Sequence, residues 1–244
     1  MKGVILAGGL GSRLSPLTKI TNKHLLPVYN QPMIYYPINT LIQSGIKEIL
    51  IISGTESAGD FMKLLGSGRD FDCQFTFRIQ DGSGGVADAL RLAESFAARD
   101  NLAVILGDNI FSHHFREEVR KFKDGAQIFL KEIPDPERFG VADYRDGKIL
   151  SIQEKPKNPP SNLAVTGFYL YDYGVFAKIK KLKPSARNEY EITDINNFYI
   201  QEERMQGKII EGDWSDAGTF ESLFRASSII RRELGSEHIR LSGK

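Results

Sequence analysis

Apolar positions in the first half of the chain fall into short continuous runs separated by longer segments with helical spacing. Continuous runs rich in β-branched residues predict buried strands, whereas the alternating run with Phe75, Phe77 and Ile79 on one face predicts a half-buried strand. The predicted strands are 2–6, 48–53, 73–80 and 102–106. The predicted helices are 31–44 (with Pro32 in its first turn and Gly45 as its stop), 57–65 and 84–98.

This alternation of strands and helices indicates an α/β fold with a Rossmann-like, mostly parallel central sheet and helices on both faces. In such sheets, ligands bind beyond the carboxyl ends of the strands. Gly8, Gln80 and Asp108 each stand at or just past the end of a predicted strand. We therefore expect these three residues along one rim of the sheet.

From about residue 125 onward the strands follow one another closely. The predicted strands are 126–133, 141–144, 148–153 and 164–171, with Arg145-Asp146-Gly147 as a hairpin turn. A helix is expected from about Thr193-Asp194 to about Arg204. No linker interrupts the chain, so we predict a single domain, 1–244. It divides into a first half of about 1–124, a mixed β half of about 125–226 and a short tail of about 227–244.

Composition and charge exclude several classes of protein. An apolar content of 41% over 244 residues suffices for a large core, and a net charge of +1 gives no basic field for nucleic acid. The single cysteine, Cys73, excludes an internal disulfide and is expected to be a small buried hydrophobe. No apolar stretch reaches about 18 residues, and the chain enters a strand at once, without a leader pattern. We expect a soluble, cytoplasmic protein with no nucleic-acid or membrane partner.

Three glycines, Gly8, Gly9 and Gly11, follow the first strand. Glycine allows a tight turn and leaves backbone N–H groups exposed to anions. Arg13 adds a guanidinium whose geometry matches phosphate oxygens. The run lacks the third glycine of the dinucleotide fingerprint and the Lys-Ser/Thr pair of the P-loop. From these residues alone, a nucleotide phosphate cradle and an ordinary glycine-rich turn are both open.

A longer ordered pattern surrounds the glycines. It consists of Gly8-Gly9-Leu10-Gly11-Ser12-Arg13-Leu14, Pro16-Leu17-Thr18, Asn22-Lys23-His24-Leu25-Leu26-Pro27-Val28 and Gln31-Pro32-Met33-Ile34-Tyr35-Tyr36-Pro37-Ile38. This pattern resembles the signature of the sugar-1-phosphate nucleotidyltransferases and, within that family, of the glucose-1-phosphate thymidylyltransferases. The resemblance extends to about Ala226. It implies the nucleotide-diphospho-sugar transferase fold, with a nucleotide-binding first half and a mixed β sugar-binding layer.

The resemblance also implies a set of nucleotide-binding residues. In the family, the residues that match Arg13 and Lys23 contact the nucleotide phosphates, so these two are the predicted catalytic residues. A lysine considered alone is more often an exposed side chain with a hydrated ammonium group. Gln80 and the Gly85 backbone would contact the base. The full set implied is Leu6, Gly8, Gly9, Gly11, Ser12, Arg13, Lys23, His24, Gln80, Gly85 and Asp108.

Two acidic residues match the family's metal ligands. Asp108 follows a buried strand in Leu106-Gly107-Asp108-Asn109-Ile110, and Asp216 lies in Trp214-Ser215-Asp216-Ala217-Gly218-Thr219. Carboxylates with substrate phosphates suit a hard divalent cation, and the resemblance implies Mg²⁺. By themselves, Asp108 also suits a helix cap and Asp216 an Asx turn.

The sugar phosphate is assigned to the second half by the same resemblance. Gly140 would let a sugar pack on backbone, Glu154 would accept hydrogen bonds from hydroxyls, and Lys155 would pair with the phosphate. In isolation, Glu154-Lys155 suits a solvated charge pair. The implied set is Asn109, Gly140, Glu154, Lys155, Val165, Tyr169 and Trp214.

Three positions depart from the family pattern. His24 replaces a glutamine that is usual in this branch, Ser83 replaces a proline, and Asn188 stands where glycine is frequent. A looser loop at Ser83 would alter the choice of base or sugar, although Asp81 or Ser83 also suits a helix cap. The tail is shorter than the C-terminal helical region of the family, which contributes subunit contacts and a regulatory site, so a homo-oligomer is only one possibility.

The leading hypothesis is Mg²⁺-dependent transfer from a nucleoside triphosphate to a sugar 1-phosphate, with dTTP and glucose 1-phosphate as the best candidates. The second keeps this chemistry with UTP or another triphosphate and a different sugar 1-phosphate. The third is a nucleotide-sugar-binding regulator without turnover. Arg13, Lys23, Asp108 and Asp216 are all present, which argues against the regulator.

Overall fold

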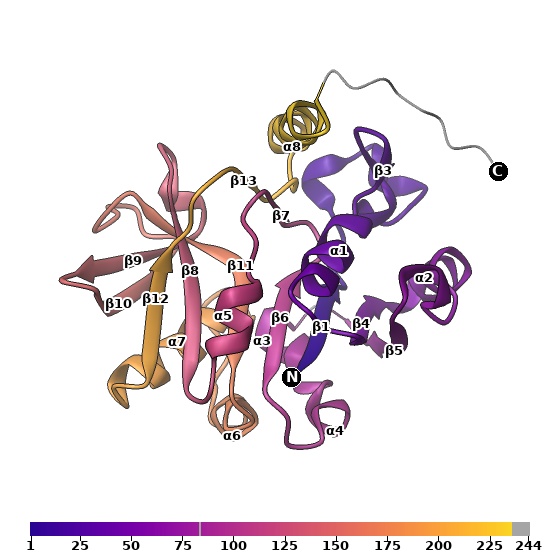
Figure 1. Ribbon diagram of the computed structural model, residues 1–244. Coiled ribbons are helices and arrows are strands. Elements are labelled where there is room, and N and C mark those ends of the chain that lie inside the picture. The colour runs from indigo at the N-terminus through magenta and orange to yellow at the C-terminus, as the bar shows by residue number, and fades with distance from the viewer. Residues whose placement is uncertain (83, 236–244) are drawn as a thin grey trace.

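The computed structural model describes residues 1–82 and 84–235 (Figure 1). Two regions of interest from the sequence, Ser83 and the end of the tail at 236–244, lie outside the described residues. Within the described part, no helix combines the length and apolar character needed to cross a membrane.

Among the described residues, nine strands form one sheet in the order β10-β9-β11-β6-β1-β4-β5, with β8 paired to β11 and β12 paired to β8. These strands are β1 (Lys2–Ala7), β4 (Glu48–Gly54), β5 (Gln74–Gln80), β6 (Leu102–Leu106), β8 (Ala126–Glu132), β9 (Gly140–Arg145), β10 (Lys148–Glu154), β11 (Leu163–Tyr171) and β12 (Met205–Ile209). Two short ladders pair β2 (Pro27–Val28) with β3 (Gln31–Pro32) and β7 (Ile110–Phe111) with β13 (Trp214–Ser215).

The first half of the sheet is parallel, as predicted. Strand β1 pairs in parallel with β4 and β6, and β4 pairs in parallel with β5. The second half continues the same sheet through β11, which runs antiparallel to β6, with Phe168 opposite Ile105. The predicted hairpin joins β9 to β10, and Asp146 and Gly147 have φ values of 50° and 80°, as a tight hairpin turn requires.

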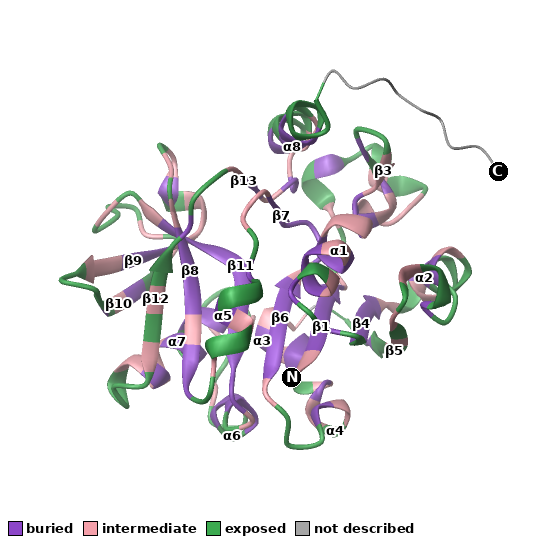
Figure 2. Cartoon of the chain, viewed as in Figure 1, coloured by how far each residue is buried: buried purple, intermediate pink, exposed green. Residues whose placement is uncertain are grey.

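Helices cover both faces of the sheet, which confirms the predicted fold class. Alternate residues of a strand point to opposite faces: Val4 and Leu6 belong to one apolar core, and Ile5 and Ala7 to the other. The first core packs on α3, α6 and α7, and the second on α1 and α2, so the central strands are buried along most of their length (Figure 2). The helices are α1 (Tyr35–Gln43), α2 (Ala58–Leu65), α3 (Val86–Arg91), α4 (Glu94–Ala97), α5 (Arg116–Lys121), α6 (Val175–Ile179), α7 (Ile192–Gln201) and α8 (Phe220–Glu233).

Several predicted boundaries were wrong. The helix expected at 31–44 begins at Tyr35, because Pro32 pairs within β3 and Pro37 is the proline in the first turn, where a missing N–H costs little. The helix expected at 84–98 divides into α3 and α4. Strand β5 is an edge strand, so Ile79 is 47% exposed and Cys73 is only partly buried.

Candidate active site

A cavity of about 510 Å³ opens where β1, β5 and β6 end, and the second half of the chain forms its other wall. Gly8, Gln80 and Asp108 line it together, as the topology predicts. Every candidate site residue from the sequence lines this same cavity. These residues are Leu6, Gly8, Gly9, Gly11, Ser12, Arg13, Lys23, His24, Gln80, Gly85, Asp108, Asn109, Gly140, Glu154, Lys155, Val165, Tyr169, Trp214 and Asp216.

The glycine loop after β1 is packed between two polar side chains. A β-carbon at Gly8 would lie 2.6 Å from the side-chain oxygen of Gln80. Gly11 has φ of +66°, and a β-carbon there would lie 2.9 Å from Cβ of Lys23. Both contacts are shorter than a real β-carbon tolerates. At Gly11 the positive φ also favours glycine, whereas a side chain at Gly8 would have to displace the end of the Gln80 side chain. The Gln80 side chain therefore lies beside the first glycine of the loop, and the Lys23 side chain lies beside the last.

Lys23 and Asp108 form an ion pair inside the cavity. The Lys23 ammonium donates a 2.5 Å hydrogen bond to Oδ2 of Asp108, and Nδ2 of Asn109 donates a 2.9 Å hydrogen bond to Oδ1. Burial alone would raise the pKa of Asp108, but the charge of Lys23 and these hydrogen bonds hold it below its ordinary value. Asp108 is therefore ionised, as a metal ligand must be.

A two-stranded ladder brings Asp216 to Asp108 across more than a hundred residues of sequence. Strand β7 begins two residues after Asp108, and β13 ends one residue before Asp216, with Ser215 opposite Ile110. Helix α8 then begins after Thr219, whose hydroxyl caps it by accepting a hydrogen bond from the Ser222 N–H. Asp216 is thus held between a strand pair and a capped helix.

The Asp108 and Asp216 carboxylates converge on one region of the cavity. A β-carbon placed on Gly218 would lie 3.4 Å from Oδ2 of Asp216, 3.5 Å from Oδ2 of Asp108 and 3.1 Å from Nη2 of Arg13. Burial, and then the charge of Asp108, raise the pKa of Asp216. Asp108 is buried and Asp216 is partly buried, so a cation between these two oxygens would offset the repulsion between the carboxylates, and the pair suits a divalent ion.

The chemistry of this donor set fits magnesium in particular. Within the described residues, no three His, Cys, Asp or Glu side chains gather as a metal cluster. Magnesium is commonly held by one or two carboxylates, while substrate phosphates and water supply the remaining oxygens. Asp108 and Asp216 would therefore hold the ion only in part, and bound substrate would complete its coordination.

Arg138 was missed as a site residue by the sequence reasoning. Its guanidinium donates hydrogen bonds to Asp135 at 2.9 Å and to Oδ2 of Asp216 at 3.2 Å, and it lines the cavity. Arg187 was also missed: it donates to Glu154 at 3.1 Å and to Glu191 at 2.9 Å. Both residues lie in or beside runs that resemble the family, but only the fold shows which carboxylate each one meets.

His24 is buried in the cavity wall and is neutral. Oδ1 of Asn22 accepts from the His24 backbone N–H at 2.9 Å and lies 2.7 Å from Nδ1, so Nδ1 carries the proton. Burial, followed by the charge of Lys23, lowers the pKa of His24 to about 3. The imidazole thus gives the site no charge and leaves Nε2 as an acceptor.

This buried histidine makes folding stability depend on pH. Above pH 6.5 the side chain is neutral in both folded and unfolded chains, and stability falls as pH drops from 6.5 towards 3, because only the unfolded chain takes up the proton. At pH 5 the loss is about 2 kcal/mol, at about 1.4 kcal/mol per pH unit. His24→Gln should remove this part of the pH dependence. Urea unfolding of both proteins at pH 7 and pH 5 measures it, and an equal loss in both would contradict it.

The opposite wall of the cavity contains the carboxylate of Glu154 and the buried phenol of Tyr169. Glu154 accepts from the Thr193 hydroxyl at 2.6 Å and from Arg187, which fixes its orientation towards the cavity. Lys155, with φ of 43°, lies 3.8 Å from Glu154. Burial raises the pKa of Tyr169, so its hydroxyl is a neutral donor. The Glu154 carboxylate and the Tyr169 hydroxyl can form hydrogen bonds with the hydroxyls of a ligand, and the Lys155 ammonium can pair with an anion.

Asn109 connects the two walls. Its Oδ1 accepts from the Trp214 indole N–H at 2.7 Å and from the Gly167 N–H at 2.9 Å, while its Nδ2 donates to Asp108. The Trp214 ring also packs on Phe139, with ring centroids 5.0 Å apart. Asn109 and Trp214 therefore orient Asp108, in addition to any contact they make with a substrate.

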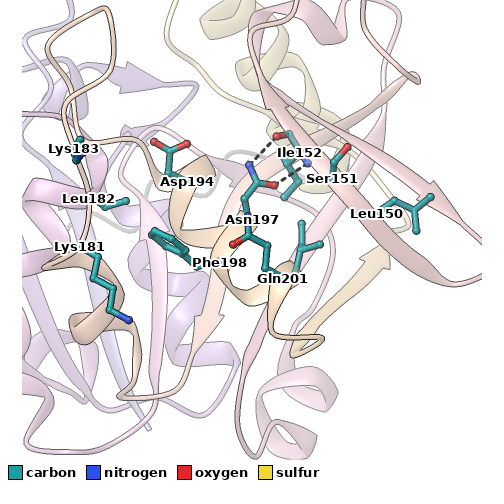
Figure 3. Close-up of a pocket in the computed structure, with 11 residues that line it drawn as sticks. Leu150, Ser151, Ile152, Lys181, Leu182, Lys183, Asp194, Asn197, Phe198 and Gln201 are labelled. Atoms are coloured by element: carbon teal, nitrogen blue, oxygen red, sulfur yellow. Dashed lines mark hydrogen bonds between the residues drawn. The ribbon is translucent and has the colours of Figure 1, made fainter.

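A second hollow of about 580 Å³ lies between β10, α7 and the segment 181–183 (Figure 3). None of the candidate site residues lines it. Oδ1 of Asn197 accepts a 3.1 Å hydrogen bond from the Ile152 backbone N–H, and its Nδ2 donates a 3.0 Å hydrogen bond to the Ile152 carbonyl. The charged residues that line this hollow are Lys181, Lys183 and Asp194, whereas all of the candidate residues line the first cavity, which we therefore take as the site.

Residues 2–233 match the family model described as nucleotidyl transferase. The chain belongs to the nucleotidyl transferase family. This confirms the family predicted from the glycine-loop pattern.

Relatives of this family are similar over nearly the whole chain. A glucose-1-phosphate thymidylyltransferase from Neisseria meningitidis is 40% identical over 99% of this chain and 86% of its own length. One from Mycolicibacterium smegmatis is 41% identical over 95% of this chain and 82% of its own. A Bacillus anthracis protein assigned as a glucose-1-phosphate thymidylyltransferase and crystallised with sucrose is 54% identical, with a TM-score of 0.91 over 95% of this chain and 96% of its own. A UDP-glucose pyrophosphorylase crystallised with UDP-glucose is 26% identical, with a TM-score of 0.82 over 94% and 97%.

Proposed function

We propose that the protein transfers a nucleotidyl group from a nucleoside triphosphate to a hexose 1-phosphate, with release of pyrophosphate and a requirement for Mg²⁺. The best candidates are dTTP and glucose 1-phosphate, which would give dTDP-glucose. The observation that carries this proposal is the convergence of Asp108 and Asp216 beside Arg13 and Lys23, in a cavity shared by both halves of the chain. The thymidylyltransferase relatives support the choice of substrates.

In the proposed reaction, a phosphate oxygen of the sugar attacks the α-phosphorus of the triphosphate. The new P–O bond forms as the bond to the bridging oxygen breaks, and pyrophosphate leaves with that electron pair. The attacking phosphate is already an anion near neutral pH, so no general base is needed. The Arg13 and Lys23 cations would offset the charge that accumulates on the phosphate oxygens.

The remaining residues would position the two substrates for in-line attack. When bound to Asp108 and Asp216, the metal would neutralise phosphate charge and align the reacting groups. The glycine loop would let the triphosphate approach the backbone closely, and Glu154 and Lys155 would hold the sugar and its phosphate. Bringing two polyanions together in a fixed geometry accounts for much of the barrier that such an enzyme must lower.

A second candidate keeps the reaction and replaces dTTP with UTP. The observation in its favour is the fold shared with a UDP-glucose pyrophosphorylase. Thymine and uracil differ by one methyl group, which a pocket distinguishes by only about 1–3 kcal/mol. Both nucleotides therefore belong in the test.

The test is pyrophosphate release from dTTP, UTP, CTP and GTP, each with several hexose 1-phosphates and Mg²⁺. We expect the highest kcat/KM with dTTP and glucose 1-phosphate, and loss of the signal when EDTA removes the metal. Nucleotide binding without pyrophosphate release from any pair would contradict the proposal and favour a regulator. Release that persists in EDTA would contradict the role of the metal.

A further inference from the structure

One end of the cavity lies away from its cations. A β-carbon added to Gly9 or Gly11 would lie close to Lys23, whereas one added to Gly8 would lie close to Gln80, so the loop has the Lys23 ammonium near one end and the Gln80 amide near the other. Beside Gln80 the cavity is lined by Gly85, Val86 and Ala89, at and just after the start of α3. If the triphosphate follows the cations of the proposed function, this apolar end receives the base.

The amide of Gln80 is held in one orientation there. Gln80 is only 6% exposed, and its Nε2 donates a 3.0 Å hydrogen bond to Oδ2 of Asp88. Oδ1 of the same carboxylate accepts from Nη2 of Arg91 at 2.9 Å. A carboxylate accepts hydrogen bonds and cannot donate them, so a flipped amide would set two oxygens against each other. Asp88 therefore keeps Nε2 turned towards α3 and leaves Oε1 facing Gly8.

We propose that Asp88 is a positioning residue that selects the base, because it presents Gln80 to the cavity as an acceptor. Thymine and uracil carry a ring N–H on their pairing edge, which an acceptor matches. Cytosine has a lone pair at that ring position and would face the oxygen of Gln80 without a hydrogen bond. The site should therefore take a pyrimidine with a ring N–H and reject cytosine.

This inference rests on the proposed function for the placement of the nucleotide, and its test uses a matched pair of nucleotides. Deoxyuridine and deoxycytidine triphosphates have the same sugar and phosphates and differ only on the pairing edge. Affinity measured by calorimetry with Mg²⁺ reports on the base even if no turnover occurs, and kcat/KM with glucose 1-phosphate reports on the reaction. We expect wild-type protein to prefer dUTP by about 100-fold or more, since a buried acceptor left without its donor is costly.

The variant that isolates the effect is Asp88→Asn. Asparagine keeps an oxygen for Arg91 and replaces only the atom that faces Gln80 with an amide nitrogen. Gln80 would then turn its oxygen towards residue 88 and its nitrogen towards the base. We expect the dUTP preference to fall at least about tenfold, with improved binding of dCTP, because a donor now meets the cytosine acceptor. Asp88→Ala, which removes the anchor without supplying a donor, should also reduce the preference.

The matched control is Asp81→Asn, at an exposed acidic residue in the same loop that accepts a hydrogen bond from Thr55 at 3.5 Å. Its dUTP preference should equal that of wild type. A purely structural role for Asp88 would weaken both nucleotides together and leave their ratio unchanged, and this outcome would overturn the inference. Equal affinity of wild-type protein for both nucleotides would overturn it as well. Absence of pyrophosphate release with a preserved dUTP preference would instead contradict only the proposed function.

Discussion

Replacing Asp108 with asparagine is expected to remove nearly all turnover, by about 1,000-fold or more in kcat, while the fold stays intact. Asparagine retains the shape of the side chain and an oxygen at this position. It loses the charge that attracts a divalent cation and that pairs with the Lys23 ammonium. Steady-state pyrophosphate release at saturating substrates measures the effect, and circular dichroism checks the fold.

Asp143→Asn is the matched control for this substitution. Asp143 pairs with Arg145 near the end of β9 and does not line the cavity, so its loss should leave kcat within about twofold of wild type, as expected of a surface pair. Wild-type turnover in Asp108→Asn would remove Asp108 from the metal site. A folded Asp108→Asn protein without turnover that still binds Mg²⁺ as wild type does would place the ion elsewhere.

Lys23→Ala should lower kcat by about 100- to 1,000-fold, the usual effect of removing one preorganised group that stabilises transition-state charge. The lysine backbone lies in a short turn that Asn22 caps, and its ammonium is held by the ion pair with Asp108 before substrate arrives. Because it would act on the triphosphate, the KM for the nucleotide should also rise. Initial rates with each substrate varied in turn separate these effects.

Lys19→Ala tests whether any lysine in this segment would give the same result. Lys19 is exposed and lies outside the cavity, so its removal should leave both substrates unaffected. If Lys23→Ala raised the KM for the sugar phosphate alone, with kcat unchanged, Lys23 would belong to the sugar side of the cavity.

The parallel half of the fold was predictable because its signals are local and strong. A continuous apolar run such as Leu102–Leu106 places apolar side chains on both faces of a strand, so it indicates a strand that is covered on both faces. Short elements were missed: β7 and β13 have two residues each, α5 has six, and β12 is a half-exposed strand. Such elements form because tertiary partners hold them, so their sequences carry little pattern. The partly covered face of β5 likewise depends on its edge position in the sheet.

The members of the candidate site were predictable, but their mutual contacts were not. The glycine loop, Lys23 and the two acidic residues lie in runs that resemble the family, and all of them line one cavity. That Lys23 meets Asp108 depends on how the turn Lys23–Leu25 packs on the end of β6, and that Arg138 meets Asp216 depends on where the β7–β13 pair places Asp216. That Asp88 meets Gln80 depends on where α3 begins. These contacts join segments distant in sequence or depend on a helix boundary, which a single sequence locates poorly.

The pairing of two remote carboxylates on one ion is tested most directly by a crystal structure with Mn²⁺ and a bound sugar nucleotide, using anomalous scattering to locate the metal. The account predicts one ion within about 2.3 Å of an oxygen from each of Asp108 and Asp216, with its remaining positions taken by phosphate and water. An ion held by neither residue, or by one of them with the other turned away, would contradict it.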